Sequence, residues 1–439
     1  MLTKVFFKNF KSYRQGELPL APLTMLIGAN ASGKSNALEG LRLLSWLAQG
    51  QKLSSIQYAL QDSDKVVRGQ VRELGYHGSQ SFTLGCETSE KDWNHLSVQL
   101  SVRKEEELHI ENEMMTGPAA PPPLYEVAQP SAELNTDLRV AYNNFAKGGK
   151  KPQLVCSDQL AIFTQLESAA RFADGHSKSQ KVIPAVTRKL QQWLSDVLFL
   201  DPVPARMRGY SFKNEKRLSG DGKTLSSVLY GLCNESVENQ KLLLNFIRSL
   251  PEQDVVEMGF LDGPRGETMV KLWETFGGTK RDYDASLLSD GTLRVLAIAA
   301  AMLSAQEGSL VVIEEIDNGV HPSRAVLLLE HISEVAEKRS LRVLLSSHNP
   351  ALLDAIPDSA IPHVVFCYRD PEIGDSRLIR LQDLTDYPEL IAQGSIGELM
   401  TSGMLERFVK HHPGPEQKKA RALDWLKNFS REDGEENDR

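Results

Sequence analysis

The chain has 439 residues, with 50 Lys and Arg against 58 Asp and Glu, and a formal net charge of −8. At about 150 residues per domain, this length predicts roughly three domain-sized units, or one large domain with insertions. The charge excludes a generally basic nucleic-acid-binding coat, although it is compatible with local basic surfaces.

The cysteines and the apolar segments indicate whether the protein is cytoplasmic, secreted or membrane-spanning. The four cysteines are far apart and form no CxxC pair, which argues against a structural zinc site and a disulfide framework. The longest strongly apolar stretch, 295–303, is much shorter than the ~18 to 20 residues that cross a bilayer. Residues 1–13 lack the apolar core of a signal peptide. We therefore expect a cytoplasmic protein that does not span a membrane.

The predicted elements begin and end with an α/β pattern. Strand-forming residues at 5–10 and 23–27, followed by a helical pattern at 36–47, predict a β-loop-α opening. The last third alternates in the same way, which favours a parallel sheet. Its predicted elements are a helix at 291–304, a strand at 309–314, a helix at 323–338, and strands at 342–346 and 363–368.

The middle of the chain has a different character. Alternating segments at 81–87, 96–103 and 106–111 predict an antiparallel β lobe. Glycine and prolines between 116 and 130 mark an exposed connection. Helical patterns follow at 160–170, 182–198 and 224–250, without a sustained heptad repeat. We therefore expect five parts: 1–60, the first half of an α/β head; 61–115, the β lobe; 116–280, a proline-rich connection and helical insertion; 281–368, the second half of the head; and 369–439, a C-terminal helical segment and acidic tail.

A phosphate-binding loop joins the predicted strand at 23–27 to the predicted helix at 36–47. The sequence from Gly28 to Ser35 fits the pattern GxxxxGK[ST] in the strand-loop-helix context that this motif requires, through Gly28, Ala29, Asn30, Ala31, Ser32, Gly33, Lys34 and Ser35. Its backbone N–H groups would surround a phosphate, Lys34 would reach the β and γ phosphates, and Ser35 would ligate Mg²⁺. A second GKT, at 222–224, lacks the first glycine and the preceding strand, and we interpret it as a turn before a helix.

Three further motifs follow in a fixed order. Ser289, Asp290 and Gly291 precede an apolar helix, Glu314 and Glu315 end a buried strand, and His348 follows another apolar strand. Taken singly, the first is explained by a helix cap, the acids by a solvated strand end and the histidine by a capping residue. Because side chains alternate along a strand, Glu314 and Glu315 are expected to point to opposite sides, one towards a metal and one towards water.

The ordered set resembles an ABC-type ATPase head of the SMC/RecF group, and especially the compact AAA-type branch that includes overcoming-lysogenization-defect (OLD) proteins and phage-defence ATPases. The resemblance implies that residues 28–36, with Asn36 as the last, bind ATP as the Walker A loop. It also implies that Ser289, Asp290 and Gly291 are the signature that reaches the ATP of a second subunit. By the same resemblance, Glu314 and Ser35 would hold Mg²⁺. The catalytic roles would fall to Glu315 as the base, His348 as the switch histidine and Lys34, and Asp317 would be the D-loop acid.

Some features depart from the family pattern. Asp290 stands where transporters have Gly, the metal acid is Glu314 in place of Asp, and Gln70 is only a weak candidate for the Q-loop glutamine. The interval from Lys34 to Ser289 is too long for a transporter and lacks the coiled coil of a long SMC arm. The residues after His348 contain no D-x-D of a Toprim nuclease domain. Nuclease activity would therefore come from a separately encoded partner.

The resemblance implies a homodimer or higher homo-oligomer formed through the ATP sites. DNA or RNA contact through local basic loops is a further candidate, at the interleaved cations and aromatics of 206–217 and at Lys147, Lys150 and Lys151, although a solvated charged turn is the favoured interpretation of both segments. A helix at 416–429 carries an apolar stripe for its own subunit or a partner, and the acidic tail 431–439 is expected to be disordered.

The function expected from the sequence is an ATPase that acts as a sensor or scaffold for an effector, often a nuclease, in bacterial anti-phage defence. The alternatives are a RecF/SMC-like DNA-repair ATPase that binds DNA ends or gaps, and a small-molecule kinase that shares only the P-loop.

Overall fold

A six-stranded sheet forms the centre of the protein. The computed structural model describes residues 1–57, 66–103, 106–118, 122–132, 135–248, 255–276, 278–318, 322–384 and 386–411. The strand order is β10-β15-β16-β3-β17-β18, with β10 (Leu198–Leu200), β15 (Leu310–Ile313), β16 (Arg342–Ser346), β3 (Leu23–Ile27), β17 (Val364–Arg369) and β18 (Ser376–Arg380). All neighbours are parallel except β17 and β18. The predicted α/β class with a mixed, mostly parallel sheet is confirmed.

An eight-stranded antiparallel sheet forms the β lobe. Its order is β2-β1-β4-β5-β6-β7-β8-β9, with β1 (Leu2–Phe10), β2 (Tyr13–Pro19), β4 (Ser81–Thr88), β5 (His95–Val102), β6 (Leu108–Thr116), β7 (Tyr125–Gln129), β8 (Asp137–Tyr142) and β9 (Gln153–Ser157). Alternate residues of β5 are buried, as expected for a sheet with one face on a core. The lobe packs against α1 (Lys34–Ala48), α3 (Ile162–Gln165) and α4 (Ser177–Ser195).

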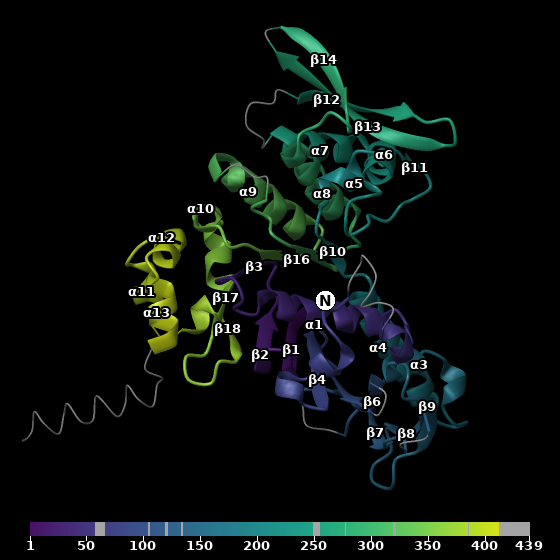
Figure 1. Cartoon of the computed structure of the whole chain (residues 1–439). Helices are drawn as coiled ribbons and strands as arrows, with labels where there is room; N and C mark the ends of the chain where they lie inside the picture. Colours follow the sequence, from purple (N-terminus) through teal and green to yellow (C-terminus); the bar gives the residue numbers. More distant parts are fainter. Residues whose placement is uncertain are drawn as a thin grey trace, which may run out of the picture.

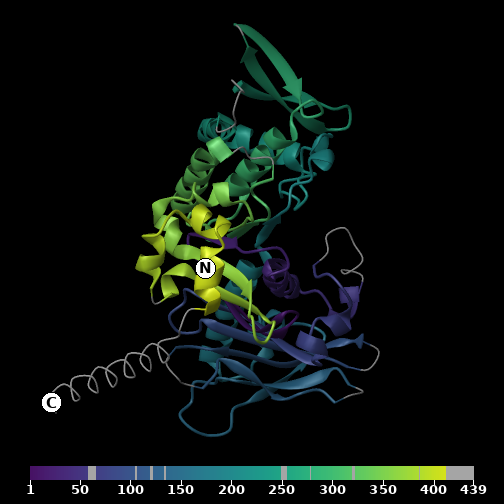
Figure 2. The same ribbon diagram turned by 60° about the vertical axis from the view of Figure 1, so that its left-hand side comes forward.

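A third sheet lies at the opposite end of the molecule from the β lobe, with the central sheet between them (Figures 1 and 2). It contains β11 (Ser211–Phe212), β12 (Val255–Asp262), β13 (Glu267–Phe276) and β14 (Thr279–Asp284). The helices α6 (Leu225–Glu235) and α7 (Val237–Arg248) pack between this sheet and α8 (Asp290–Ser304). Helix α8 is buried on nearly all sides, which explains its uniformly apolar sequence.

Further helices complete the described chain. Helix α5 (Pro204–Met207) follows β10, and α9 (Pro322–Lys338) connects β15 to β16. After β16 come α10 (Pro350–Leu353), α11 (Tyr387–Ile391), α12 (Ile396–Thr401) and α13 (Met404–His411). The helix expected at 416–429 and the acidic tail lie outside the described residues. None of the described helices is both long and apolar enough to cross a membrane.

The segment 116–280 contains more strand than its sequence indicates. We expected a connection and helices there, but β7 to β9 extend the β lobe and β12 to β14 form the third sheet. The helix predicted at 160–170 is reduced to α3, and the one at 224–250 is divided between α6 and α7. These strands form because of the strands they pair with. The local sequence pattern carries no information about such distant partners.

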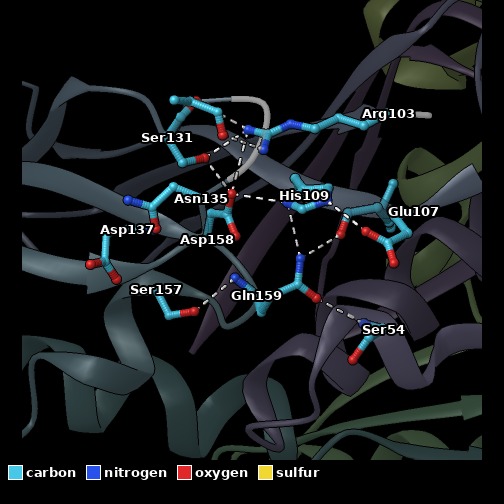
Figure 3. Close-up of polar contacts among 12 residues, drawn as sticks. Ser54, Arg103, Glu107, His109, Ser131, Asn135, Asp137, Ser157, Asp158 and Gln159 are labelled. Carbon is cyan, nitrogen blue, oxygen red and sulfur yellow. Dashed lines mark hydrogen bonds and ion pairs between the residues drawn. The ribbon is translucent and has the colours of Figure 1, made fainter. Parts of the chain in front are cut away.

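A buried polar cluster joins the β lobe to the turn after α1 (Figure 3). Its centre is Asp158, whose Oδ2 accepts hydrogen bonds from Ser131 and lies 2.9 Å from Nδ1 of His109 and 3.4 Å from the Arg103 guanidinium. The neighbouring Gln159 accepts two hydrogen bonds from the backbone of the turn. Its backbone carbonyl oxygen accepts from the N–H of Leu53 (2.9 Å), and its side-chain Oε1 accepts from the N–H of Ser54 (3.1 Å). These bonds fix the β lobe relative to the helix that follows the P-loop.

Candidate ATP-binding site

The loop between β3 and α1 has the conformation of a phosphate-binding loop. Gly28 and Gly33 adopt φ angles of 148° and 121°, which L side chains rarely tolerate. A Cβ on Gly28 would lie 2.2 Å from the carbonyl oxygen of Cys367, and one on Gly33 would lie 2.2 Å from Oγ of Ser376. Both positions therefore require glycine. The N-terminus of α1 begins directly after the loop at Lys34, where N–H groups favour an anion.

Three successive carbonyl groups of this loop are held by the surrounding protein. Arg369 Nε donates to Ala31 (3.1 Å), Ser376 Oγ to Ser32 (2.6 Å) and the Tyr13 hydroxyl to Gly33 (3.1 Å). The donors come from β17, β18 and the β2 hairpin, so segments distant in sequence fix the curvature of the loop before any ligand binds.

The loop forms one wall of a pocket of ≈ 280 Å³. The structure brings most of the predicted site residues together here: the lining includes Ala29, Asn30, Ala31, Ser32, Gly33, Lys34, Ser35, Asn36, Glu314, Glu315, Ser346, Ser347 and His348. Arg68 and Arg369 also line it. The pocket thus combines a glycine-rich loop, a helix N-terminus and cationic side chains with acidic residues. Such a set fits a nucleoside triphosphate and its cation.

Lys34 is folded back onto its own loop. Its ammonium group donates to the carbonyl oxygens of Gly28 (2.5 Å) and Ala29 (3.1 Å). Desolvation lowers the pKa of Lys34, against the opposing charges of Cys367, Glu315 and Asp317. No ion pair of Lys34 is found among the described residues, so a phosphate group would provide the counter-charge for its ammonium group.

The two acids leave the strand in different ways. Glu314 follows β15 and donates its backbone N–H to the carbonyl of Leu200 on β10 (3.0 Å), while its side chain forms an ion pair with Arg42 on α1. Glu315 has a left-handed backbone, with φ 47°. The predicted strand alternation therefore does not apply beyond Ile313, and both residues line the same pocket.

The conformation of Glu315 is supported by its neighbours. Its backbone N–H donates to Ser346 Oγ at the end of β16 (3.1 Å), and Asn318 Nδ2 donates to its Oε2 (2.6 Å). Backbone strain at a non-glycine residue costs of order 1–3 kcal/mol and often occurs at functional sites. The strained position is thus the one predicted as the catalytic base.

His348 lies beside the acid predicted for the D-loop. Its Nδ1 is 3.5 Å from Oδ2 of Asp317, whose side chain is only 6% exposed. The other carboxylate oxygen, Oδ1, is buried without a hydrogen-bond partner among the described residues. The half-exposed imidazole of His348 thus lies between this buried carboxylate and the pocket, which it also lines.

The predicted signature lies elsewhere in the same chain. Ser289 is the N-cap of α8, where its Oγ accepts from the N–H of Thr292 (3.1 Å). Among the described residues that line the pocket, none belongs to the signature. The structure thus brings together the P-loop, the acids and the histidine, and leaves Ser289, Asp290 and Gly291 apart from them.

Several residues near the site carried no recognisable sequence signal. Arg42, Arg68 and Arg369 reach it from α1, a loop and the end of β17. Asp201 follows β10, and desolvation raises the pKa of its carboxyl; the Arg42 charge opposes this, and the Glu315 charge adds to it. Gln70, the weak Q-loop candidate, caps a short 3-10 helix and does not line the pocket.

The interleaved cations at 206–217 mostly have partners within the chain. Arg206 pairs with Asp221 (2.7 Å), Arg208 with Asp290 (2.5 Å) and Lys213 with Asp262 (2.7 Å), while Arg217 donates to the carbonyl of Ser195 (3.1 Å). In the second basic loop, Lys147 and Lys150 are exposed, and Lys151 donates to Asn144 (3.1 Å). The first segment is therefore less suited to track a phosphate backbone than its composition indicates.

The fold and the pocket define a P-loop nucleotide-binding protein, and the comparisons with known proteins specify its kind. Residues 1–120 match the family model described as "AAA ATPase domain", and residues 170–354 match "AAA domain, putative AbiEii toxin, Type IV TA system". The first match contains the P-loop and the second contains the signature, both acids and His348. Both matches are to AAA-type ATPase domains, which agrees with the predicted resemblance to the compact AAA-type branch.

Among solved structures, the chain is similar to SMC head domains. One is an SMC head bound to the C-terminal winged-helix domain of ScpA, at 12% identity and a TM-score of 0.47, covering 86% of this chain and 96% of that one. Another is the SMC head domain from Thermotoga maritima, at 14% identity and a TM-score of 0.40, covering 86% and 98%. A third, with an extended coiled coil and bound to a ScpA domain, is from Pyrococcus furiosus, at 10% identity and a TM-score of 0.42, covering 89% and 99%. No curated protein matches the chain.

Proposed function

We propose that the protein hydrolyses ATP as a head-to-tail dimer that encloses two ATP molecules. The observation that carries this proposal is the division of the site: the P-loop, Glu314, Glu315 and His348 line one pocket, and the signature of the same chain does not reach it. A second copy would supply the missing part. Leu287, next to the signature, is 68% exposed, and a second copy would cover it in this arrangement.

Each pocket residue has a chemical role in this proposal. Lys34 would leave its loop carbonyls to bind the β and γ phosphates and stabilise the charge that develops on them. Glu315 would orient the attacking water and accept its proton, and His348 would contact the γ-phosphate. Ser35 and Glu314 would hold Mg²⁺, which supplies charge neutralisation at the phosphate oxygens when bound.

The output we favour is control of a separately encoded effector, such as a nuclease, in bacterial anti-phage defence. The match of residues 170–354 to a family described as a putative AbiEii toxin supports a role in such systems. The net charge of −8 and the internal ion pairs at 206–217 favour protein partners over broad nucleic-acid contact.

The dimer is tested by light scattering of the Glu315→Gln protein with and without ATP. Slow or absent hydrolysis should trap the ATP-bound dimer, whereas Lys34→Ala should remain as dimeric as the unliganded protein. Ser289→Arg is the matched control, because it keeps the P-loop and obstructs the face that meets the second subunit. If Glu315→Gln with ATP is no more dimeric than without ATP, the two-chain site is wrong. ATP-dependent dimerisation would also argue against the kinase alternative.

A DNA-repair ATPase of the RecF/SMC kind remains the second candidate, since it would use the same ATP site. It is distinguished by DNA binding of the purified chain across a salt series. A slope of log affinity against log salt that corresponds to several released counterions would favour repair. Weak, salt-independent association together with tight binding to the product of a neighbouring gene would favour the effector role.

A further inference from the structure

The signature turn is held by a side chain that lies 82 residues before it. Arg208 Nη1 donates to the carbonyl oxygens of Leu288 (2.7 Å) and Ser286 (3.0 Å), and its Nη2 donates to Oδ1 of Asp290 (2.5 Å). One guanidinium group thus contacts the chain on both sides of Ser289. The basic segment at 206–217, interpreted from sequence as a candidate nucleic-acid contact, has this internal role at Arg208.

The turn also has contacts of its own: Leu288 is buried, Ser289 caps α8, and the N–H of Ser286 donates to Oδ1 of Asp284 (2.9 Å). Residues 285–289 connect β14 to α8 without regular structure, and their backbone bonds include the N–H of residue 285 to the carbonyl of Val270 and that of Leu287 to Asp284. The side chain of Asp290 is 67% exposed. Contacts with solvent do not hold an exposed carboxylate in one orientation, so the bond from Arg208 does this. The planar fork of Arg208 satisfies two carbonyl groups and a carboxylate at once, a geometry that a lysine ammonium cannot reproduce.

Arg208 follows β10, the strand that pairs with the acid-bearing strand β15. Its segment begins at β10, which pairs in parallel with β15, and Leu200 accepts the backbone N–H of Glu314 (3.0 Å). Phe199 on the same strand lies beneath the guanidinium of Arg42, 4.9 Å from the ring centre. The segment that leads to Arg208 is therefore anchored at the edge of the central sheet where β15 ends at the acids.

The residues between β10 and Arg208 are braced against the 217–224 turn. The N–H of Asp201 donates to Gly220 (2.9 Å), that of Val203 donates to Asp221 (3.0 Å), and Met207 packs so closely on Gly222 that a Cβ there would lie 2.4 Å from its sulfur. The apparent second GKT motif thus supports this segment and binds no phosphate in our interpretation. A braced segment can hold Arg208 in place without a ligand.

We propose that Arg208 is a positioning residue for the reaction: it pre-forms the signature turn of one chain for contact with the ATP bound to the other. The inference rests on the proposed two-chain site. Arg208 acts through Ser289 and Asp290 and contacts neither the P-loop nor the acids of its own pocket. Its loss therefore impairs the site on the partner chain and leaves the nucleotide affinity of its own P-loop unchanged.

The test is complementation between two defective chains. Arg208→Ala should lower the ATPase rate by about 10- to 100-fold, while its affinity for ATP as a monomer stays within about threefold of wild type. Lys34→Ala should be inactive. An equimolar mixture pairs the intact P-loop of one chain with the intact signature of the other, and random pairing should restore about a quarter of the wild-type rate. Arg208→Lys should be intermediate, since it keeps the charge and loses the fork.

Ser289→Ala, which removes the signature hydroxyl without obstructing the face between the chains, is mixed with Lys34→Ala to separate this inference from the proposed function. If that pair fails to complement, the two-chain site itself is wrong. If it complements and Arg208→Ala does not, or if Arg208→Ala alone has wild-type activity, Arg208 does not position the signature. Circular dichroism and ATP affinity of each single variant report whether it folds, so an unfolded chain cannot be mistaken for a defective signature.

Discussion

Arg42 on α1 forms an ion pair with Glu314 at the end of β15, and the same guanidinium lies over the ring of Phe199 on β10. The helix that begins at the P-loop is thereby joined to the strand that ends in the two acids. The paired side chains are 24% and 21% exposed, so both charges are partly removed from water. Such a pair is more costly to break from one side than an exposed pair.

A double-mutant cycle on Arg42 and Glu314 should therefore show a strong coupling. Arg42→Ala alone should lower the free energy of unfolding by about 1–3 kcal/mol, because Glu314 is left without its partner. The double variant Arg42→Ala/Glu314→Gln should lose less than the sum of the single losses, with a coupling free energy of about 1–2 kcal/mol in urea unfolding. The Lys4–Glu17 pair, 27% and 54% exposed, is the control and should give less than about 1 kcal/mol. Additive losses at Arg42 and Glu314 would contradict the pairing.

Gly33→Ala should abolish ATP binding. The new Cβ would have to displace Ser376, whose Oγ holds the loop, and the residue would keep an unfavourable φ of 121°. We expect at least a hundredfold loss of ATP affinity in isothermal titration, together with a loss of about 1–3 kcal/mol in stability. Gly50→Ala is the matched control, because Gly50 also has a positive φ, 71°, but open space around its Cβ position. It should lose stability and keep ATP binding. Equal ATP affinity in the two variants would show that the loop tolerates the side chain.

The parts of the site that the sequence predicts correctly are those encoded locally. The P-loop needs only its glycines, its lysine and the strand and helix beside it, and β16 has the predicted bounds because its apolar run is short and ends at polar residues. The serine at position 289 also signals a helix start by its type alone, and it does cap α8.

The remaining parts depend on contacts between distant positions. Arg42 meets Glu314 across 272 residues, and Ser376 meets Ser32 across 344, so no periodicity or spacing predicts either contact. The left-handed backbone of Glu315 depends on Ser346 and on the turn to Asn318, so the strand alternation assumed from the sequence does not extend to the second acid. Likewise, the strands within 116–280 are decided by their partners in two different sheets.

Asn318 should prove important for the rate and unimportant for ATP binding. Its amide donates to Oε2 of Glu315 at 2.6 Å, which holds the carboxylate in one orientation within the pocket. Asn318→Ala should lower kcat by about 10- to 100-fold, since an unfixed base rarely occupies the productive geometry. The ATP dissociation constant should stay within about threefold of wild type, because Asn318 is not among the residues that line the pocket. Asn318→Asp should be slower still through repulsion of Glu315. A wild-type kcat in Asn318→Ala would rule out this orienting role.

Glu113 should make the β lobe less stable as the pH rises. The side chain is fully buried, and burial raises the pKa of its carboxyl to about 7, although it accepts hydrogen bonds from Tyr125 and from the backbone of Ile162 and Phe163. Between its unfolded pKa of 4.5 and about 7, the folded protein binds more protons than the unfolded one, so the free energy of unfolding falls with rising pH across this window. The full effect is about 3 kcal/mol.

Glu113→Gln isolates this contribution, because the variant cannot titrate at position 113. Its amide nitrogen would face a backbone or hydroxyl donor, so the variant should be less stable than wild type at pH 5. The difference in free energy of unfolding should then shrink by up to about 3 kcal/mol between pH 5 and pH 8, as the wild-type protein loses the stability of its buried neutral acid. Tyr125→Phe removes a donor to the carboxylate and should extend the window to higher pH. Parallel pH profiles for wild type and Glu113→Gln in urea unfolding would mean that Glu113 does not bind a proton on folding.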